Sequence, residues 1–336
     1  MILHPGILAL LLGALLSLLL LTLALPEVWA VLRRWRPESC SEQQLRLERR
    51  TSLVSTLVAY AAGFQLVGLL LFVYATDSLH GQFVGAMCAT GTLNANPVGW
   101  NLLPLKLILF FLAAFWLALN GLIRRAPDYP LMRTVYALLP LLWLLVLLDF
   151  VLQLDFFTGL QPQIITSCCG SLFSTAGSGV AGSLGGLPVR LLMVLFYGWS
   201  LLLVGLLLAM LRFRAGWLRG AAVLAAAVFL PLSLAATIAF IAVYIYQLPG
   251  HHCPFDLLQA GYHWIGYPLY FGLFGGGFFA MLPGMGRLLC RIPSLRPLVE
   301  ATERRWILLA LAGIGLFLLL ATWPVATGPF RLLTFI

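Results

Sequence analysis

Apolar stretches of about 20 residues or more alternate with short polar connectors along the whole chain. A run of about 20 apolar residues is long enough to cross the hydrocarbon core of a bilayer as an α-helix. Runs of this length with few charges are typical of transmembrane helices rather than of a soluble core. The pattern predicts eight spans, at 7–32, 53–75, 102–123, 134–155, 190–211, 220–246, 267–288 and 306–325.

Composition points to the same class of protein. The chain of 336 residues is 62% hydrophobic and only 9% charged, whereas a soluble domain is about 25% charged. We therefore expect an all-α, polytopic bundle of about eight transmembrane helices, with residues 1–336 forming a single integral membrane domain in the lipid bilayer. The first apolar run has no basic n-region and exceeds the usual length of a signal peptide, so it is expected to be an uncleaved first helix.

Basic residues are distributed asymmetrically between the connectors. The net charge is +9, and 17 of the 20 Lys and Arg residues follow the first, third, fifth and seventh spans. The positive-inside rule predicts that these four segments are cytoplasmic and that both termini lie on the periplasmic or extracellular side of the cell inner membrane. Because the positive charge sits in short loops rather than on a soluble face, no nucleic-acid partner is expected.

Soft ligands gather on the predicted outer side. The stretch GHHCPFDLLQ at 250–259 follows the sixth span directly. All five histidines and four of the six cysteines are predicted to be outside; Cys40 and Cys290 are predicted to be cytoplasmic. The outer set comprises His4, His80, His251, His252, His263, Cys88, Cys168, Cys169 and Cys253.

Three of the outer loops resemble one another. Each carries cysteine and is followed by a helix that opens on proline, within LPLKL, LPVRL and YPLYF. Proline suits a first helical turn because its missing N–H would be unpaired there. The pattern predicts three pseudo-repeated hairpins, 53–123, 134–211 and 220–288, flanked by the helices 7–32 and 306–325. Such repeats would bring the cysteine loops to one outer surface, and membrane proteins commonly place their sites where repeats meet.

Two interpretations of the cysteines involve disulfides. Cysteines on an oxidising face commonly pair into structural disulfides that connect loops. Alternatively, the cysteines exchange disulfides, with the vicinal Cys168 and Cys169 as a labile pair and Cys88 or Cys253 as its resolving partner. His252 would then stabilise a thiolate at Cys253. The chain has no C-x-x-C motif, which weakens this second interpretation.

A third interpretation is a metal site. Thiolate and imidazole ligands together favour soft ions such as copper or zinc. The spacing matches no zinc finger, and C-x-x-C-H, the attachment motif of c-type haem, is absent. The predicted metal ligands are Cys88, Cys168, Cys169, His251, His252 and Cys253.

Ionisable residues inside the spans raise the alternative of transport, because such residues commonly mark a transport path. Asp149 lies in the fourth span, and Lys106 and Arg190 each follow a span-opening proline by two residues. Both basic side chains could instead extend to the lipid headgroups. As a pair they are expected to face Asp149 and Asp155, either tying the bundle together or binding an anion.

We therefore predict a multi-pass inner-membrane protein whose outward Cys/His loops handle thiol–disulfide redox or a soft metal for an exported partner. Cys88, Cys168, Cys169 and Cys253 would be the redox residues. A thioredoxin-like protein, a cytochrome or a metalloprotein would suit as partner, because the short loops leave no room for a catalytic domain. The alternative is a transporter, or a membrane subunit of a larger complex, whose outer cysteines form structural disulfides.

Overall fold

The computed structural model describes residues 3–36, 41–161, 163, 165–166, 188–213, 215–330 and 332. Every regular element within these ranges is a helix, and eight of the helices are long and apolar enough to cross a membrane. This confirms the all-helical class and the eight spans. The long elements are α1 (Pro5–Arg34), α2 (Glu42–Ser78), α4 (Val98–Ile123), α6 (Leu139–Thr158), α8 (Val189–Arg212), α9 (Gly216–Ala236), α11 (Gly266–Leu289) and α12 (Arg296–Thr327).

Each predicted span lies inside one membrane-spanning stretch, but the helices are longer than the apolar runs. The largest difference is at α2, which begins at Glu42 rather than near residue 53. The side chain of Ser41 caps this helix by accepting a hydrogen bond from the backbone N–H of Gln44, at 3.3 Å. A serine cap satisfies an otherwise unpaired N–H. Hydropathy therefore identifies the apolar part of a helix, whereas the serine cap identifies where the helix begins.

The chain divides into two compact units. The first comprises Met1–Val84, Gly91–Thr166 and Ile292–Leu298; the second comprises Gly85–Thr90, Ser167–Arg291 and Val299–Ile336. The helices of the predicted hairpin 134–211 belong to different units, α6 to the first and α8 to the second. The three-hairpin repeat, the single domain and the sides of the termini stay predictions.

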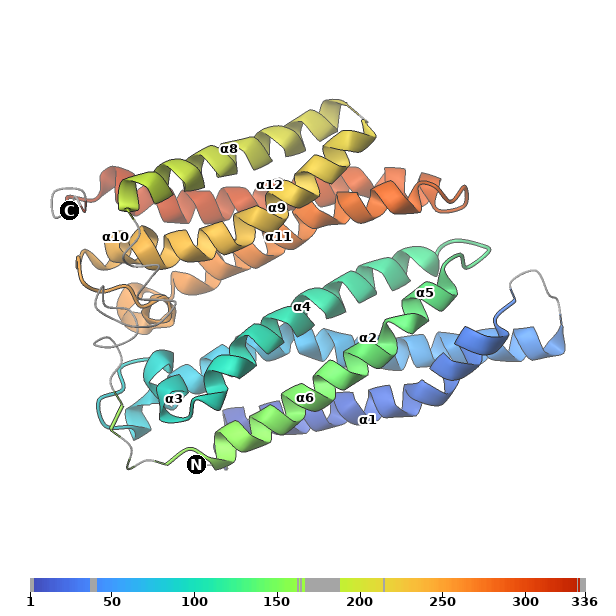
Figure 1. Cartoon of the computed structure of the whole chain (residues 1–336), viewed down its shortest axis with the longest axis horizontal. Helices are drawn as coiled ribbons and strands as arrows, with labels where there is room; N and C mark the ends of the chain where they lie inside the picture. Colours follow the sequence, from blue (N-terminus) through green and yellow to red (C-terminus); the bar gives the residue numbers. More distant parts are fainter. Residues whose placement is uncertain are drawn as a thin grey trace. The chain divides into compact units, whose positions relative to one another are not determined.

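The first unit contains α1, α2, α4 and α6, together with the short helices α3 (Ala89–Ala95, from Gly91 on) and α5 (Met132–Ala137). Its four long helices lie side by side (Figure 1). Phe72 of α2 is fully buried and packs against Phe156 and Phe157 of α6, with ring centroids 5.9 and 6.4 Å apart. Aromatic clusters of this kind stabilise helix contacts through large buried areas and edge-to-face geometry.

The second unit contains α8, α9, α11 and, from Val299 on, α12. Phe317 of α12 packs against Phe196 of α8 and Phe229 of α9, at centroid distances of 6.0 and 5.9 Å. The α9 span continues through a π-helical turn, η2 (Thr237–Ile241), into α10 (Ala242–Tyr246). This span leads directly into the loop that carries His251, His252 and Cys253.

Glycines bring α11 and α12 close together. A Cβ added at Gly276 would lie 2.6 Å from the backbone nitrogen of Ile314, and one at Gly272 would lie 2.8 Å from the carbonyl oxygen of Gly313. Small residues let transmembrane helices approach closely enough for backbone contact.

Candidate functional site: a buried thiol and carboxylate cluster

Two segments far apart in sequence meet in the second unit. Residues 85–90 belong to this unit although the residues on either side of them belong to the first. They bring Cys88 to Cys253, and the two Sγ atoms lie 3.4 Å apart. Both cysteines are 0% exposed. Because a disulfide bond measures about 2.05 Å, the sulfurs are in contact without being bonded.

Asp256 adds a carboxylate to the two sulfurs. It opens a short 3₁₀ turn, η3 (Asp256–Leu258), and is 6% exposed. One ligand atom from each of Cys88, Cys253 and Asp256 lies within 4.8 Å of the other two. Among the residues that the structure describes, Oδ1 of Asp256 has no hydrogen-bond partner. A buried carboxylate oxygen without a partner is costly, so it is a candidate ligand for a cation.

Asp256 was not among the predicted site residues. It lies three residues after Cys253 within CPFD. The chain bends at Pro254 and Phe255, so the Asp256 carboxylate lies near the Cys253 sulfur, and the spacing of three residues is the signal that could have identified it. Isolated acidic residues are ordinary in loops, which is why the sequence alone did not single it out.

The two histidines take supporting positions. The Nε2 atom of His251 lies 2.5 Å from Oδ2 of Asp256. The Nδ1 atom of His252 lies 3.0 Å from the carbonyl oxygen of Ile238; because a carbonyl only accepts, Nδ1 is the donor. Neither histidine belongs to the three-residue group found among the described residues. His251 thus contacts the Asp256 carboxylate. The ring of the buried His252 is fixed by its hydrogen bond to a backbone carbonyl.

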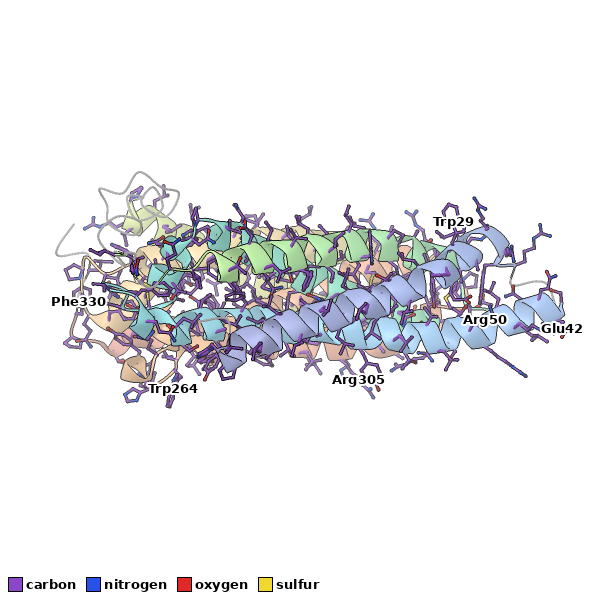
Figure 2. All side chains as sticks on the ribbon, turned by 90° about the horizontal axis from the view of Figure 1, so that it is seen from below. Trp29, Glu42, Arg50, Trp264, Arg305 and Phe330 are labelled. Carbon is purple, nitrogen blue, oxygen red and sulfur yellow. The ribbon has the colours of Figure 1, made fainter. Side chains whose placement is uncertain are left out.

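Tyrosine and glutamine side chains fix the backbone around the cysteines. The hydroxyl of Tyr246 donates to the carbonyl of Cys253 at 2.6 Å, and that of Tyr270 donates to the carbonyl of Pro254 at 2.8 Å. Gln259 donates from Nε2 to the carbonyl of Met87 at 2.6 Å, which ties the loop 247–265 to the segment that carries Cys88. Trp264, in the same loop, lies at the end of the second unit that also carries Phe330 (Figure 2).

The remaining predicted residues lie elsewhere. Cys168 and Cys169 fall outside the described residues. Lys106 and Asp149 form an ion pair in the first unit, with Nζ and Oδ1 3.0 Å apart and side chains 2% and 1% exposed. Arg190 belongs to the second unit and is exposed on α8. Among the predicted residues that it describes, the structure therefore brings Cys88 and Cys253 together and pairs Lys106 with Asp149.

No protein-family model, curated protein or solved structure matches this chain.

Proposed function

We propose that this multi-pass membrane protein binds a soft metal ion through Cys88, Cys253 and Asp256 and handles it for an exported partner. The contact between the two sulfurs, 3.4 Å apart, is the observation that carries this proposal. In a tetrahedral site with metal–sulfur bonds of about 2.3 Å, two thiolates stand about 3.8 Å apart. The cluster needs only a small opening to accept an ion. Thiolates favour copper(I) and zinc among the common metals.

Burial favours a metal over direct exchange with a protein thiol. Disulfide exchange requires an attacking thiolate to reach a sulfur, and both sulfurs are fully buried. A metal ion is small enough to bind between them once they separate by a few tenths of an ångström. The contact between His251 and Asp256 supports the same function, because a group behind a ligand commonly orients it and tunes its basicity.

The side of the membrane and the exported partner are proposed from the sequence. The arginine distribution predicts that the termini and the site lie on the outer side of the membrane, which we take to be the inner membrane of the cell. A donor set at that position would give the ion to an exported cytochrome or metalloprotein, or take it from one. The partner would bring its own domain, because the loop 247–265 and the segment 85–90 are short.

Metal content of the purified full chain tests the proposal. We expect close to one copper or zinc ion per chain, lost in Cys253→Ser. Cys290→Ser is the matched control, because Cys290 is partly exposed and is not part of the cluster. Equal metal content in the two variants would contradict the proposal. So would a metal-free chain with Cys88 and Cys253 joined in a disulfide, read by mass spectrometry after alkylation without reductant.

Thiol redox is the second candidate, favoured by the same sulfur contact. The two Sγ atoms need to approach by about 1.4 Å to form a disulfide. Oxidation would remove two electrons and two protons from the thiols and reduce one disulfide of a thioredoxin-like partner, with Cys168 and Cys169 as an intermediate pair. A reversible shift of Cys88 and Cys253 between alkylated and disulfide forms, without bound metal, would favour this reaction.

A transport function would depend on a different place, the buried Lys106 and Asp149 pair. Ionisable residues within the membrane are commonly functional. Asp149→Asn would then abolish uptake of a solute while metal binding at Cys253 stays intact.

A further inference from the structure

A small polar pocket lies at the arginine-rich end of the first unit. It occupies about 100 Å³, where the end of α1, the first turns of α2 and the end of α4 meet. We name it the Arg124 pocket. Its lining includes Trp35, Glu48, Ser52, Ser55, Arg124 and Tyr129.

The pocket is lined by one cationic side chain, Arg124, and one anionic side chain, Glu48, which do not form an ion pair with each other. Arg124 donates from Nη2 to the Ser52 hydroxyl at 3.3 Å, and Glu48 accepts from Gln44 at 3.1 Å. Within the described part of the chain, neither Arg124 nor Glu48 forms an ion pair. A guanidinium has several N–H donors in a planar fork that suits phosphate. The pocket therefore suits a ligand that carries both an anionic phosphate and a cationic amine.

The walls of the pocket are held in place. Trp35 and Tyr129 pack edge to face, with centroids 6.4 Å apart, and Arg133 donates to the carbonyl of Trp35 at 2.6 Å. Tyr129 has a φ of 44°, a left-handed conformation that a bulky residue adopts only where its surroundings compensate for the strain.

The floor of the pocket is a hydrogen-bonded network. The hydroxyl of Ser55 donates to Oδ1 of Asn120 at 3.1 Å, and the hydroxyl of Tyr136 donates to the carbonyl of Thr51 at 2.9 Å. Because these buried groups are already paired, they form a fixed surface below the ligand.

Neighbouring residues place the pocket at the depth of lipid headgroups. Trp29 is 57% exposed, and the Arg33 guanidinium lies 4.2 Å from the centre of its ring. Exposed tryptophan beside arginine at a helix end marks the membrane–water interface. Figure 2 shows Trp29 and Arg50 at this end of the first unit. The pocket therefore opens where phospholipid headgroups are abundant.

We infer that the Arg124 pocket binds a phosphoethanolamine group, with the phosphate on Arg124 and the ammonium on Glu48. The pocket is small, about 100 Å³, which favours a compact headgroup over a sugar phosphate. Basic pockets between transmembrane helices on the cytoplasmic side are known to bind lipid headgroups. Phosphatidylethanolamine is the membrane source of this group, and free phosphoethanolamine is the soluble one.

Lipid-dependent thermal stability of the full chain in detergent tests the inference. Phosphatidylethanolamine is compared with phosphatidylglycerol of the same acyl chains and with free phosphoethanolamine. We expect the ethanolamine lipid to raise the melting temperature more than the glycerol lipid. Arg124→Gln should weaken lipid binding at least tenfold, and Glu48→Gln should remove the preference for ethanolamine. Full stabilisation by free phosphoethanolamine would support the same chemistry with the soluble compound as ligand.

Arg125→Gln is the matched control, because Arg125 is exposed, adjacent in sequence and absent from the pocket lining. It should bind the lipid as the unchanged chain does. An equal loss in Arg125→Gln and Arg124→Gln would overturn the inference, because it would show diffuse charge attraction. Equal stabilisation by the two lipids would also overturn it. If Arg124→Gln does not fold, Arg124→Lys keeps the charge without the planar fork and should still lose part of the affinity.

Discussion

Lys106 of α4 and Asp149 of α6 form an ion pair inside the first unit, with Nζ 3.0 Å from Oδ1. Gln153, one turn further along α6, donates from Nε2 to Oδ2 of Asp149 at 2.5 Å. Nζ of Lys106 also lies 5.4 Å from the centre of the Phe72 ring. The two charges are therefore balanced by each other, by an amide and by an aromatic face.

Removing one charge of this pair should destabilise the protein strongly. Lys106→Met leaves the Asp149 carboxylate buried without its cation, and breaking a buried pair in this way costs about 3–5 kcal/mol. Thermal unfolding in detergent provides the measurement. The double variant Lys106→Met with Asp149→Leu should recover most of the loss, because no uncompensated charge is left. A double variant less stable than either single variant would show that the pair is not coupled in this way.

The close contact between α11 and α12 makes a second prediction. Gly276→Ala places a Cβ 2.6 Å from a backbone atom of Ile314, so the helices must move apart. Overpacking of this kind typically costs about 1–3 kcal/mol. Gly275→Ala is the control, since a Cβ there meets nothing within 4 Å. A lowered melting temperature is expected for Gly276→Ala alone, and equal melting temperatures would argue against the packing.

The two-bond geometry of the ion pair between Arg219 and Glu303 should stabilise the protein beyond the attraction between the two charges. The Nε and Nη2 atoms of Arg219 donate to the two carboxylate oxygens at 2.6 and 2.7 Å. Arg219→Lys keeps the charge but loses the planar fork, so unfolding should become easier by about 1 kcal/mol. Arg46→Lys, in an exposed pair with Glu42, should have almost no effect, because solvent screens such pairs. Equal effects in calorimetry would contradict this ranking.

The position of His251 behind Asp256 predicts its effect on metal affinity. His251→Ala should weaken binding roughly 10–100-fold, as is typical for a group that orients a ligand, while the number of bound ions stays the same. Asp256→Ala, which removes the carboxylate itself, should weaken binding more. Competition with a chromophoric chelator measures both. The exposed His263 provides the control variant, His263→Ala, whose affinity should be unchanged; a matching loss there would point to surface binding instead.

The predicted orientation can be tested independently of the site. With both termini outside, alkaline phosphatase fused to the C-terminus should be active in the periplasm. Cys290, which follows α11 at the predicted cytoplasmic end, should react with an impermeant maleimide only after the membrane is permeabilised. An inactive fusion together with a readily labelled Cys290 would reverse the orientation.

The sequence predicted the eight spans well because hydrocarbon thickness sets the length of a transmembrane helix. It could not predict that α6 and α8 belong to different compact units. Helices in lipid associate through local packing of small and polar residues rather than by burial from water, so hydropathy does not identify a helix's neighbours. Likewise, the start of α2 depends on the Ser41 cap and not on apolar length.

Part of the candidate site was also within reach of the sequence. The common side of Cys88 and Cys253 followed from topology, and the structure places their sulfurs in contact across 165 residues. The proximity of Asp256 to the two cysteines was missed because it depends on how the chain bends at Pro254 and Phe255. The prediction that His251 and His252 are metal ligands treated all soft donors in the loop alike. The hydrogen bonds of His251 to Asp256 and of His252 to Ile238 are visible only in the structure.

The hydrogen bond from His252 to Ile238 sets how deeply the cysteine loop is inserted. Ile238 lies in the π-helical turn, eight residues before the end of α10 at Tyr246, which corresponds to roughly 12 Å along a helix axis. The chain thus folds back below the rim of its own span before it reaches Cys253. Because both sulfurs are fully buried, single ions and other species of few atoms are favoured over any protein surface as their reaction partners.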